Sequence, residues 1–191
     1  MRLGYTITTP SLNSKACSGN TLVPKPPEVQ GAGISWQHNV HYFLYAEGIL
    51  LIDFMSQKVT ITGVYYADLL HKLRLPLKRS VGKSWPKYKV LLHDNAPAHT
   101  SHVGQAAILE SGFEEMHHPP YSPDMAPSDY HLFPNLKQHL RGQRFSTDDK
   151  LKYETEEWLK EQSELFYFTG IEKLRQRYEL CIEKGLDYVE K

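Results

Sequence analysis

The amino-acid sequence predicts an α/β fold with a mixed sheet flanked by helices. Two β-rich runs, residues 40–45 and 49–54, are separated by a short turn and indicate an antiparallel hairpin. Apolar residues at helical spacing follow at residues 60–77. Residues 89–93 form a short apolar run, as expected of a strand, and lead into a further helical segment. At 191 residues, the chain has the length of one domain.

The first 35 residues lack this order. They contain four prolines and no apolar periodicity, so we expect residues 1–35 to form an irregular N-terminal arm. Residues 36–191 are expected to form the folded domain. Within it, the helix at residues 60–77 is expected to end near Pro76, because proline interrupts the hydrogen bonds of a helix interior.

The second half of the chain continues as strand and helix units and ends in C-terminal helices. Pro97 is expected to open a helix that runs to about Glu110. The predicted elements after it are a strand at residues 113–116, a proline-rich loop at 119–127, a helix at 128–140 with Ser128 as N-cap, and two helices, the first opened by the capping-box spacing of residues 146–149. This is the element order of a ribonuclease-H-like sheet without its first strand, with chemistry expected beyond the carboxyl ends of the strands.

The charge distribution limits where nucleic acid could bind. The chain carries 22 basic and 22 acidic side chains, so any affinity for DNA must come from local clustering. Such a cluster lies between Asp68 and Asp94, where no acidic residue occurs. The candidate DNA-binding residues in this window are Lys72, Arg74, Lys78, Arg79 and Lys83. The alternative is an ordinary solvated helix face.

Cysteine usage and hydropathy indicate a soluble intracellular protein. Cys17 and Cys181 offer neither a disulfide framework nor metal-ligand spacing. The longest apolar run, residues 48–55, is short and contains Asp53. We therefore expect no membrane partner and no small-molecule substrate.

Two aspartates carry the candidate chemistry. Asp94 follows the strand at residues 89–93, and Asp129 opens the helix at residues 128–140. Hard oxygen ligands of this kind suit Mg²⁺ (or Mn²⁺), and paired ions of this type cleave phosphodiester bonds. We therefore take Asp94 and Asp129 as candidate catalytic and metal-binding residues. The alternative is that Asp94 opens a turn and Asp129 stabilises the first turn of a helix.

A second metal hypothesis uses imidazole, which suits zinc rather than magnesium. The histidines near the candidate site are His93, His99, His102, His117, His118 and His131. No pair of them has the spacing of a known zinc motif, which argues against zinc.

The sequence around the two aspartates resembles a known family. Residues 93–99 read HDNAPAH, and residues 121–131 read YSPDMAPSDYH. Both blocks resemble metal-binding segments of mariner-family DNA transposases, and the resemblance covers about residues 40–191. It extends to the transposase-derived half of SET-domain methyltransferases fused to a mariner element. It implies a catalytic domain at residues 36–191 that binds DNA and Mg²⁺ and cleaves and transfers DNA strands in the nucleus.

The resemblance also implies parts that this sequence does not show. The family's first catalytic aspartate lies in a Gly-Asp-Glu segment on the first strand, whereas this sequence has no aspartate before Asp53. The family's helix-turn-helix domain has no counterpart either. We therefore expect an N-terminally truncated catalytic domain with little or no strand transfer. Two alternatives stay open: a competent nuclease in which Glu28 or Asp53 supplies the third ligand, and a non-enzymatic DNA- or protein-binding module.

The resemblance assigns a further role to the loop before Asp129. In the family, the motif matched by Tyr121, Ser122, Pro123, Asp124 and Met125 meets a partner subunit, so a homodimer or a transposase partner subunit is implied. The flanking prolines stiffen this loop, which suits docking. We expect Tyr121 and Met125 to be exposed. The alternative is a brace, in which Tyr121 packs inward and the prolines position Asp129.

Overall fold

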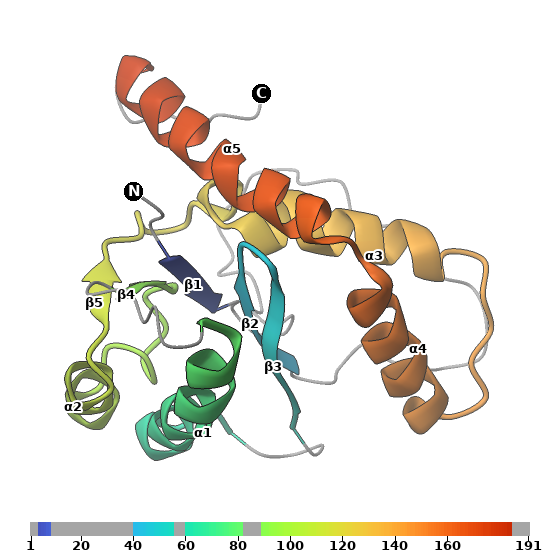
Figure 1. The fold of residues 1–191 in the computed structure, drawn as a ribbon, viewed down its shortest axis with the longest axis horizontal. Coiled ribbons are helices and arrows are strands. Elements are labelled where there is room, and N and C mark those ends of the chain that lie inside the picture. The colour runs from blue at the N-terminus through green and yellow to red at the C-terminus, as the bar shows by residue number, and fades with distance from the viewer. Residues whose placement is uncertain (1–3, 9–39, 56–59, 82–88, 185–191) are drawn as a thin grey trace, which may run out of the picture.

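The structure is a computed structural model that describes residues 4–8, 40–55, 60–81 and 89–184 (Figure 1). A five-stranded mixed sheet lies at its centre, with the strand order β3-β2-β1-β4-β5. The strands are β1 (Gly4–Thr8), β2 (Val40–Tyr45), β3 (Gly48–Phe54), β4 (Lys89–Leu92) and β5 (Glu114–Met116). β2 runs antiparallel to β1 and β3, and β4 runs parallel to β1 and β5. The predicted hairpin and mixed sheet are therefore confirmed.

β1 corrects two expectations, the irregular arm and the missing first strand. It lies between β2 and β4, and Ile7 is opposite Leu44 on one side and Leu92 on the other. Its aromatic and β-branched residues suit a strand, but five residues are too few to show a clear period. Pairing with distant strands decides the structure of this segment. The rest of the predicted arm, residues 9–39, lies outside the described residues.

Helices cover the two faces of the sheet (Figure 1). Successive side chains of a strand point to opposite faces, so Phe43 packs with α1 (Gly63–Val81) and α2 (His102–Glu110). Its neighbours Tyr42 and Leu44 pack on the other side. The helices there are α3 (Phe133–Leu140), α4 (Asp148–Glu161) and α5 (Glu164–Glu183). The sheet thus separates two apolar cores.

α1 does not end near Pro76, as expected, but continues to Val81. Leu73 and Leu77, on either side of the proline, are buried in the core. Their packing outweighs the backbone hydrogen bond that the proline cannot donate. Among the helices of the described residues, none has the length and apolar character needed to cross a membrane.

Candidate functional site

Asp94 lies just beyond the carboxyl end of β4, in a loop that holds its carboxylate. The backbone amide of Ala96 donates to Oδ1 of Asp94 over 3.1 Å. Nδ1 of His99 lies 2.6 Å from the same oxygen. His99 is buried, and its ring packs on that of Tyr66 with 4.2 Å between centroids. The orientation of the Asp94 carboxylate is therefore set by a neighbour that is itself fixed.

This loop also corrects the predicted start of α2, which begins at His102 and not at Pro97. The side chain of Ser101 is the N-cap and accepts a hydrogen bond from the amide of Gly104 over 3.1 Å. The residues between Asp94 and Ser101 wrap around the carboxylate instead of forming the first helical turn.

The surroundings of Asp94 favour its ionised form. Burial alone would raise the pKa of this carboxyl group. The hydrogen bond and charge of His99, with the amide of Ala96, outweigh that effect and hold the pKa of Asp94 below its usual value. Asp94 is therefore a carboxylate at neutral pH.

Asp129 lies on η2, a π-helical turn at Ser128–Leu132 that precedes α3. The predicted regular helix at residues 128–140 is thus divided, and Ser128 is its first residue instead of its N-cap. The Ser128 hydroxyl donates to Oδ2 of Asp129 over 3.2 Å. π-Helical turns are rare and occur often at functional sites.

The fold places Asp94 and Asp129 near enough for the charge of Asp94 to act on Asp129, although 34 residues separate them in the sequence. Burial raises the pKa of Asp129 to about 6, and the negative charge of Asp94 adds to this rise. The hydrogen bond from Ser128 and the charge of Lys137 oppose it. A carboxylate pair of this kind is electrostatically unfavourable until a cation lies near it.

The two aspartates fit a hard divalent cation such as Mg²⁺ or Mn²⁺. No lysine or arginine occurs between Asn95 and Leu136. However, β1, the strand beside β4, reads Gly-Tyr-Thr-Ile-Thr and brings no carboxylate to the site. Within the described ranges, no group of three or more His, Cys, Asp or Glu side chains could hold a metal ion.

Asp53, one candidate for the third ligand, has partners on α1. Asp53 lies on β3 opposite His41. Its carboxylate accepts a hydrogen bond from the Tyr65 hydroxyl and lies 3.4 Å from Nζ of Lys72. These two contacts give Asp53 a structural role between β3 and α1. Glu28 lies outside the described residues.

Within the described residues, the histidines of the zinc hypothesis form no group that could hold a metal ion. His99 contacts Asp94, and Nε2 of His93 lies 3.3 Å from a carboxylate oxygen of Glu115. Nε2 of His131 lies 2.9 Å from the carbonyl oxygen of Phe166 on α5. His102 and His117 are exposed, and His118 is buried.

The candidate DNA-binding residues lie on the exposed side of α1. Lys72, Arg74, Lys78 and Arg79 are all exposed, and Lys83 lies outside the described residues. The N-terminal residue of α1, Gly63, approaches the loop after Asp94. Lys78 lies about 22 Å farther along the helix axis. The positive charge of Arg74 helps to lower the pKa of Lys89, at the start of β4, after the larger effect of burial.

Most of the candidate DNA-binding residues of α1 lie apart from the two aspartates. Asp94 follows the end of β4, whereas Arg74 acts on its first residue. Arg74, Lys78 and Arg79 therefore lie toward the opposite end of the sheet from the aspartates. Lys72 differs, because it contacts Asp53, which lies at the same end of the sheet as Asp94. A bound duplex would have to extend over the side of the domain to reach both ends.

The predicted interface motif, Tyr121–Met125, is only partly on the surface. Tyr121 has 78% of its side chain exposed and a backbone φ of 55°, in the left-handed region. Met125, expected to be exposed, is 1% exposed, because the 3₁₀ turn η1 (Pro123–Met125) directs it into the core. The prediction for Met125 is wrong. In this motif Tyr121 points to solvent, whereas Met125 packs into the core and braces the loop.

Sequence reasoning missed two residues that support the site, one at Asp94 and one at the turn that carries Asp129. His99 was considered only as a zinc ligand, although its place five residues after Asp94 in one loop was a local signal. Arg177 has no such signal. Its guanidinium lies 4.0 Å from the ring centroid of Tyr130, next to Asp129, and it is 53 residues from its hydrogen-bond partner Asp124.

The sheet order and the paired aspartates at the end of β4 define a ribonuclease-H-like domain with a carboxylate site. No family model matches the chain. It is 32% identical to the Mos1 mariner transposase of Drosophila mauritiana over 149 residues, which is 75% of this chain and 42% of that protein. It is 34% identical to the histone-lysine N-methyltransferase SETMAR of Homo sapiens over 147 residues, 75% of this chain and 21% of that protein. The chain thus spans less than half the length of these relatives.

Solved structures agree with these sequence relatives. The Mos1 transposase catalytic domain with raltegravir and manganese has a TM-score of 0.75 and 30% identity, covering 80% of this chain and 78% of that chain. The same domain with magnesium gives the same TM-score and identity. A Mos1 paired-end complex with the left transposon end has a TM-score of 0.77 and 26% identity, covering 97% of this chain and 56% of that chain. The protein belongs to the mariner transposase family and matches its catalytic domain.

Proposed function

We propose that this protein is a transposase catalytic domain that binds DNA and Mg²⁺ (or Mn²⁺) but has little or no strand cleavage and transfer. One observation carries the proposal: Asp94 and Asp129 converge at the end of β4, while the adjacent β1 carries no carboxylate. Two metal ions bring four positive charges, and two aspartates offset only two of them. Family membership supports the reaction class, and the relatives solved with manganese or magnesium support the metal.

The residues of the site have distinct proposed roles. Asp94 and Asp129 would hold the metal, and His99 and the amide of Ala96 keep Asp94 ionised and oriented. The Ser128 hydroxyl orients Asp129. When bound, paired metal ions activate the attacking oxygen and stabilise the leaving oxygen of a phosphodiester.

The proposed partners are DNA and a second transposase subunit. Mos1 has been solved with transposon-end DNA in a paired-end complex, which supports both by family. The exposed basic residues of α1 are the proposed DNA contacts, and exposed Tyr121 is the proposed contact with a partner subunit. We also propose that the protein acts in the nucleus, where its DNA is. Exclusion of a tagged full-length chain from nuclei would count against this.

A plasmid nicking assay in Mg²⁺ and in Mn²⁺ tests the proposed impairment. We expect cleavage near background for the wild-type chain and for Asp94→Ala alike. Robust cleavage by the wild-type chain that Asp94→Ala abolishes would overturn the impairment and leave a competent nuclease. In that case Asp53→Asn and Glu28→Gln test the third ligand, because only a ligand's loss should weaken Mg²⁺ binding.

The second candidate is a non-enzymatic DNA- or protein-binding module. It is favoured by the distance between Lys78 and Arg79, near the C-terminal end of α1, and the loop after Asp94. It predicts that DNA binding persists in Asp94→Ala/Asp129→Ala and is lost in Lys78→Gln/Arg79→Gln. Binding that depends instead on the two aspartates and added metal would support the catalytic-domain proposal.

A further inference from the structure

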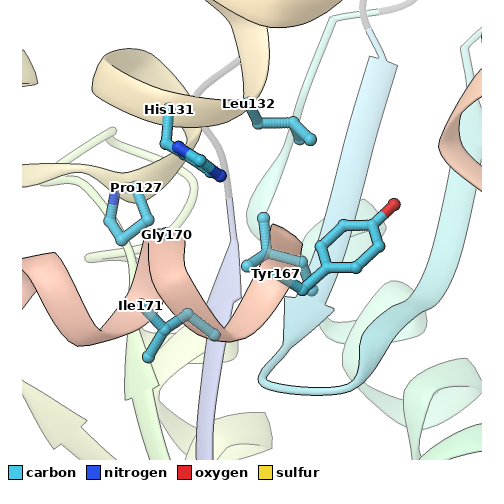
Figure 2. A pocket seen from close by; sticks show the side chains of 7 residues that line it. Pro127, His131, Leu132, Tyr167, Gly170 and Ile171 are labelled. Atoms are coloured by element: carbon cyan, nitrogen blue, oxygen red, sulfur yellow. The ribbon is translucent and has the colours of Figure 1, made fainter. Parts of the chain in front are cut away.

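The two residues that follow Asp129 both bond to α5. The Tyr130 hydroxyl donates to the carbonyl oxygen of Gly170 over 2.7 Å. Nε2 of His131 lies 2.9 Å from the carbonyl oxygen of Phe166. Figure 2 shows His131 beside Gly170 on this helix. The turn that carries Asp129 is thus joined to a helix that begins more than 30 residues later in the chain.

Gly170 allows this close approach. A Cβ atom at this position would overlap the ring of His131. The space left between η2 and α5, beside Pro127 and Ile171, is a cavity of about 10 Å³, room for at most about one water molecule (Figure 2). The contact is therefore a packed joint and offers no room for a ligand.

Arg177 extends the joint along α5. Its guanidinium stacks on Tyr130, and its Nη1 donates to the carbonyl oxygen of Asp124 over 2.9 Å. One side chain therefore contacts both η1 and η2. The next residue, Tyr178, donates from its hydroxyl to the carbonyl oxygen of His117 over 3.0 Å. α5 thus holds the chain before, within and after the loop at residues 119–127.

The conformation of η2 needs such outside support. A π-helical turn is less favourable than a regular helix, and the amides of Asp129 and Tyr130 both bond to the same carbonyl oxygen, that of Ala126. These bonds and that from Ser128 fix Asp129 only relative to its own turn, and not relative to Asp94. The contacts with α5 supply the missing constraint.

We propose that Arg177 is a positioning residue for Asp129, because it holds η1 and η2 in the conformation that carries Asp129 to Asp94. The metal-binding role of Asp129 rests on the proposed function. The positioning itself concerns only contacts within the chain, so the two can be tested separately.

The test is a Mn²⁺ titration of the full chain, followed by electron paramagnetic resonance. Arg177→Met keeps an apolar stem but removes the guanidinium, and we expect it to weaken Mn²⁺ binding by about tenfold, the lower end of the effect of residues that orient metal ligands. Arg177→Lys keeps the charge without the planar stack and should show a smaller loss. The matched control is Arg175→Met, on the exposed side of the same helix, where Arg175 forms a surface ion pair with Glu179; it should bind as the wild type does.

Hydrogen exchange of the amides at residues 124–132 is the second readout and does not require metal. Arg177→Met should speed exchange there at least about tenfold, and Arg175→Met should leave it unchanged. Absence of Mn²⁺ binding by the wild type, together with this exchange pattern, would remove the proposed function and support the positioning. Wild-type exchange and wild-type Mn²⁺ binding in folded Arg177→Met would overturn the proposal. If Arg177→Met does not fold, the same comparison is made with Arg177→Lys.

Discussion

Replacing Gly170 by alanine sets two effects of opposite sign against each other. In a helix interior, this change ordinarily stabilises by about 1 kcal/mol. Here the new Cβ would lie 3.0 Å from Cγ and 3.1 Å from Nε2 of His131, and closer still to Cδ2. Overpacking of this kind costs about 1–3 kcal/mol, and loss of the His131–Phe166 hydrogen bond costs about 1 kcal/mol more. We therefore expect Gly170→Ala to destabilise the fold by about 1–3 kcal/mol.

Urea unfolding of Gly170→Ala, His131→Ala and the double variant tests this reasoning. Without the His131 ring, the clash is gone and the helix preference of alanine remains. In the His131→Ala background, Gly170→Ala should therefore stabilise by up to about 1 kcal/mol, a reversal of sign. Exposed Gln176→Ala on the same helix is the control and should change stability by less than about 0.5 kcal/mol. Equal destabilisation by Gly170→Ala in both backgrounds would refute the role given to His131.

Three further predictions concern stability. Burial, with the charge of His99, lowers the pKa of His41 to about 4. The contribution of His41 to stability should therefore be full above about pH 6.5 and fall by up to about 3 kcal/mol toward pH 4, as the unfolded chain protonates first. Urea titrations over this pH range should show a smaller fall for His41→Leu. Leu73→Ala removes a side chain with 0% exposure and should cost about 2–5 kcal/mol in the same assay. Ser163→Ala removes the N-cap of α5 and should cost about 1 kcal/mol, whereas exposed Ser146→Ala should cost little.

The parts of the fold that were predictable have a local signal. Consecutive apolar residues indicate the strand in which Tyr42, Phe43 and Leu44 alternate between the two cores. They also indicate the short strand that ends at Leu92. The start of α4 is likewise a short-range feature, although its N-cap is Thr147 and not Ser146, the first residue of the predicted capping box; the N-cap of α5, Ser163, was not predicted. In these segments, local preference and the final packing agree.

The remaining elements depend on distant contacts. β1 is a strand because Ile7 finds Leu44 and Leu92, which no window of neighbouring residues can show. α1 continues past Pro76 because the sheet and α2 cover the leucines around it. In both cases tertiary packing overrides a local expectation.

The candidate site shows the same division. Asp94 and Asp129 were found from their short sequence blocks, and the structure brings them together. The π-helical turn at Asp129 and the inward direction of Met125 were not foreseen, because both depend on where α5 lies. A motif indicates which residues act, whereas the support of those residues comes from elements far away in the chain.

The sheet and the metal site depend on different interactions, so the sheet can form although β1 carries no carboxylate. β1 is held by backbone pairing to β2 and β4, which does not depend on an acidic side chain. The metal site has the opposite requirement, since its affinity depends on the number of carboxylates and hardly on strand pairing. A carboxylate on β1 would therefore add ligand charge to the site but is not needed for the sheet. Asp129 has a pKa raised to about 6, partly by the charge of Asp94, and α5 holds the turn that carries it, so the support of Asp129 comes from α5 and not from β1.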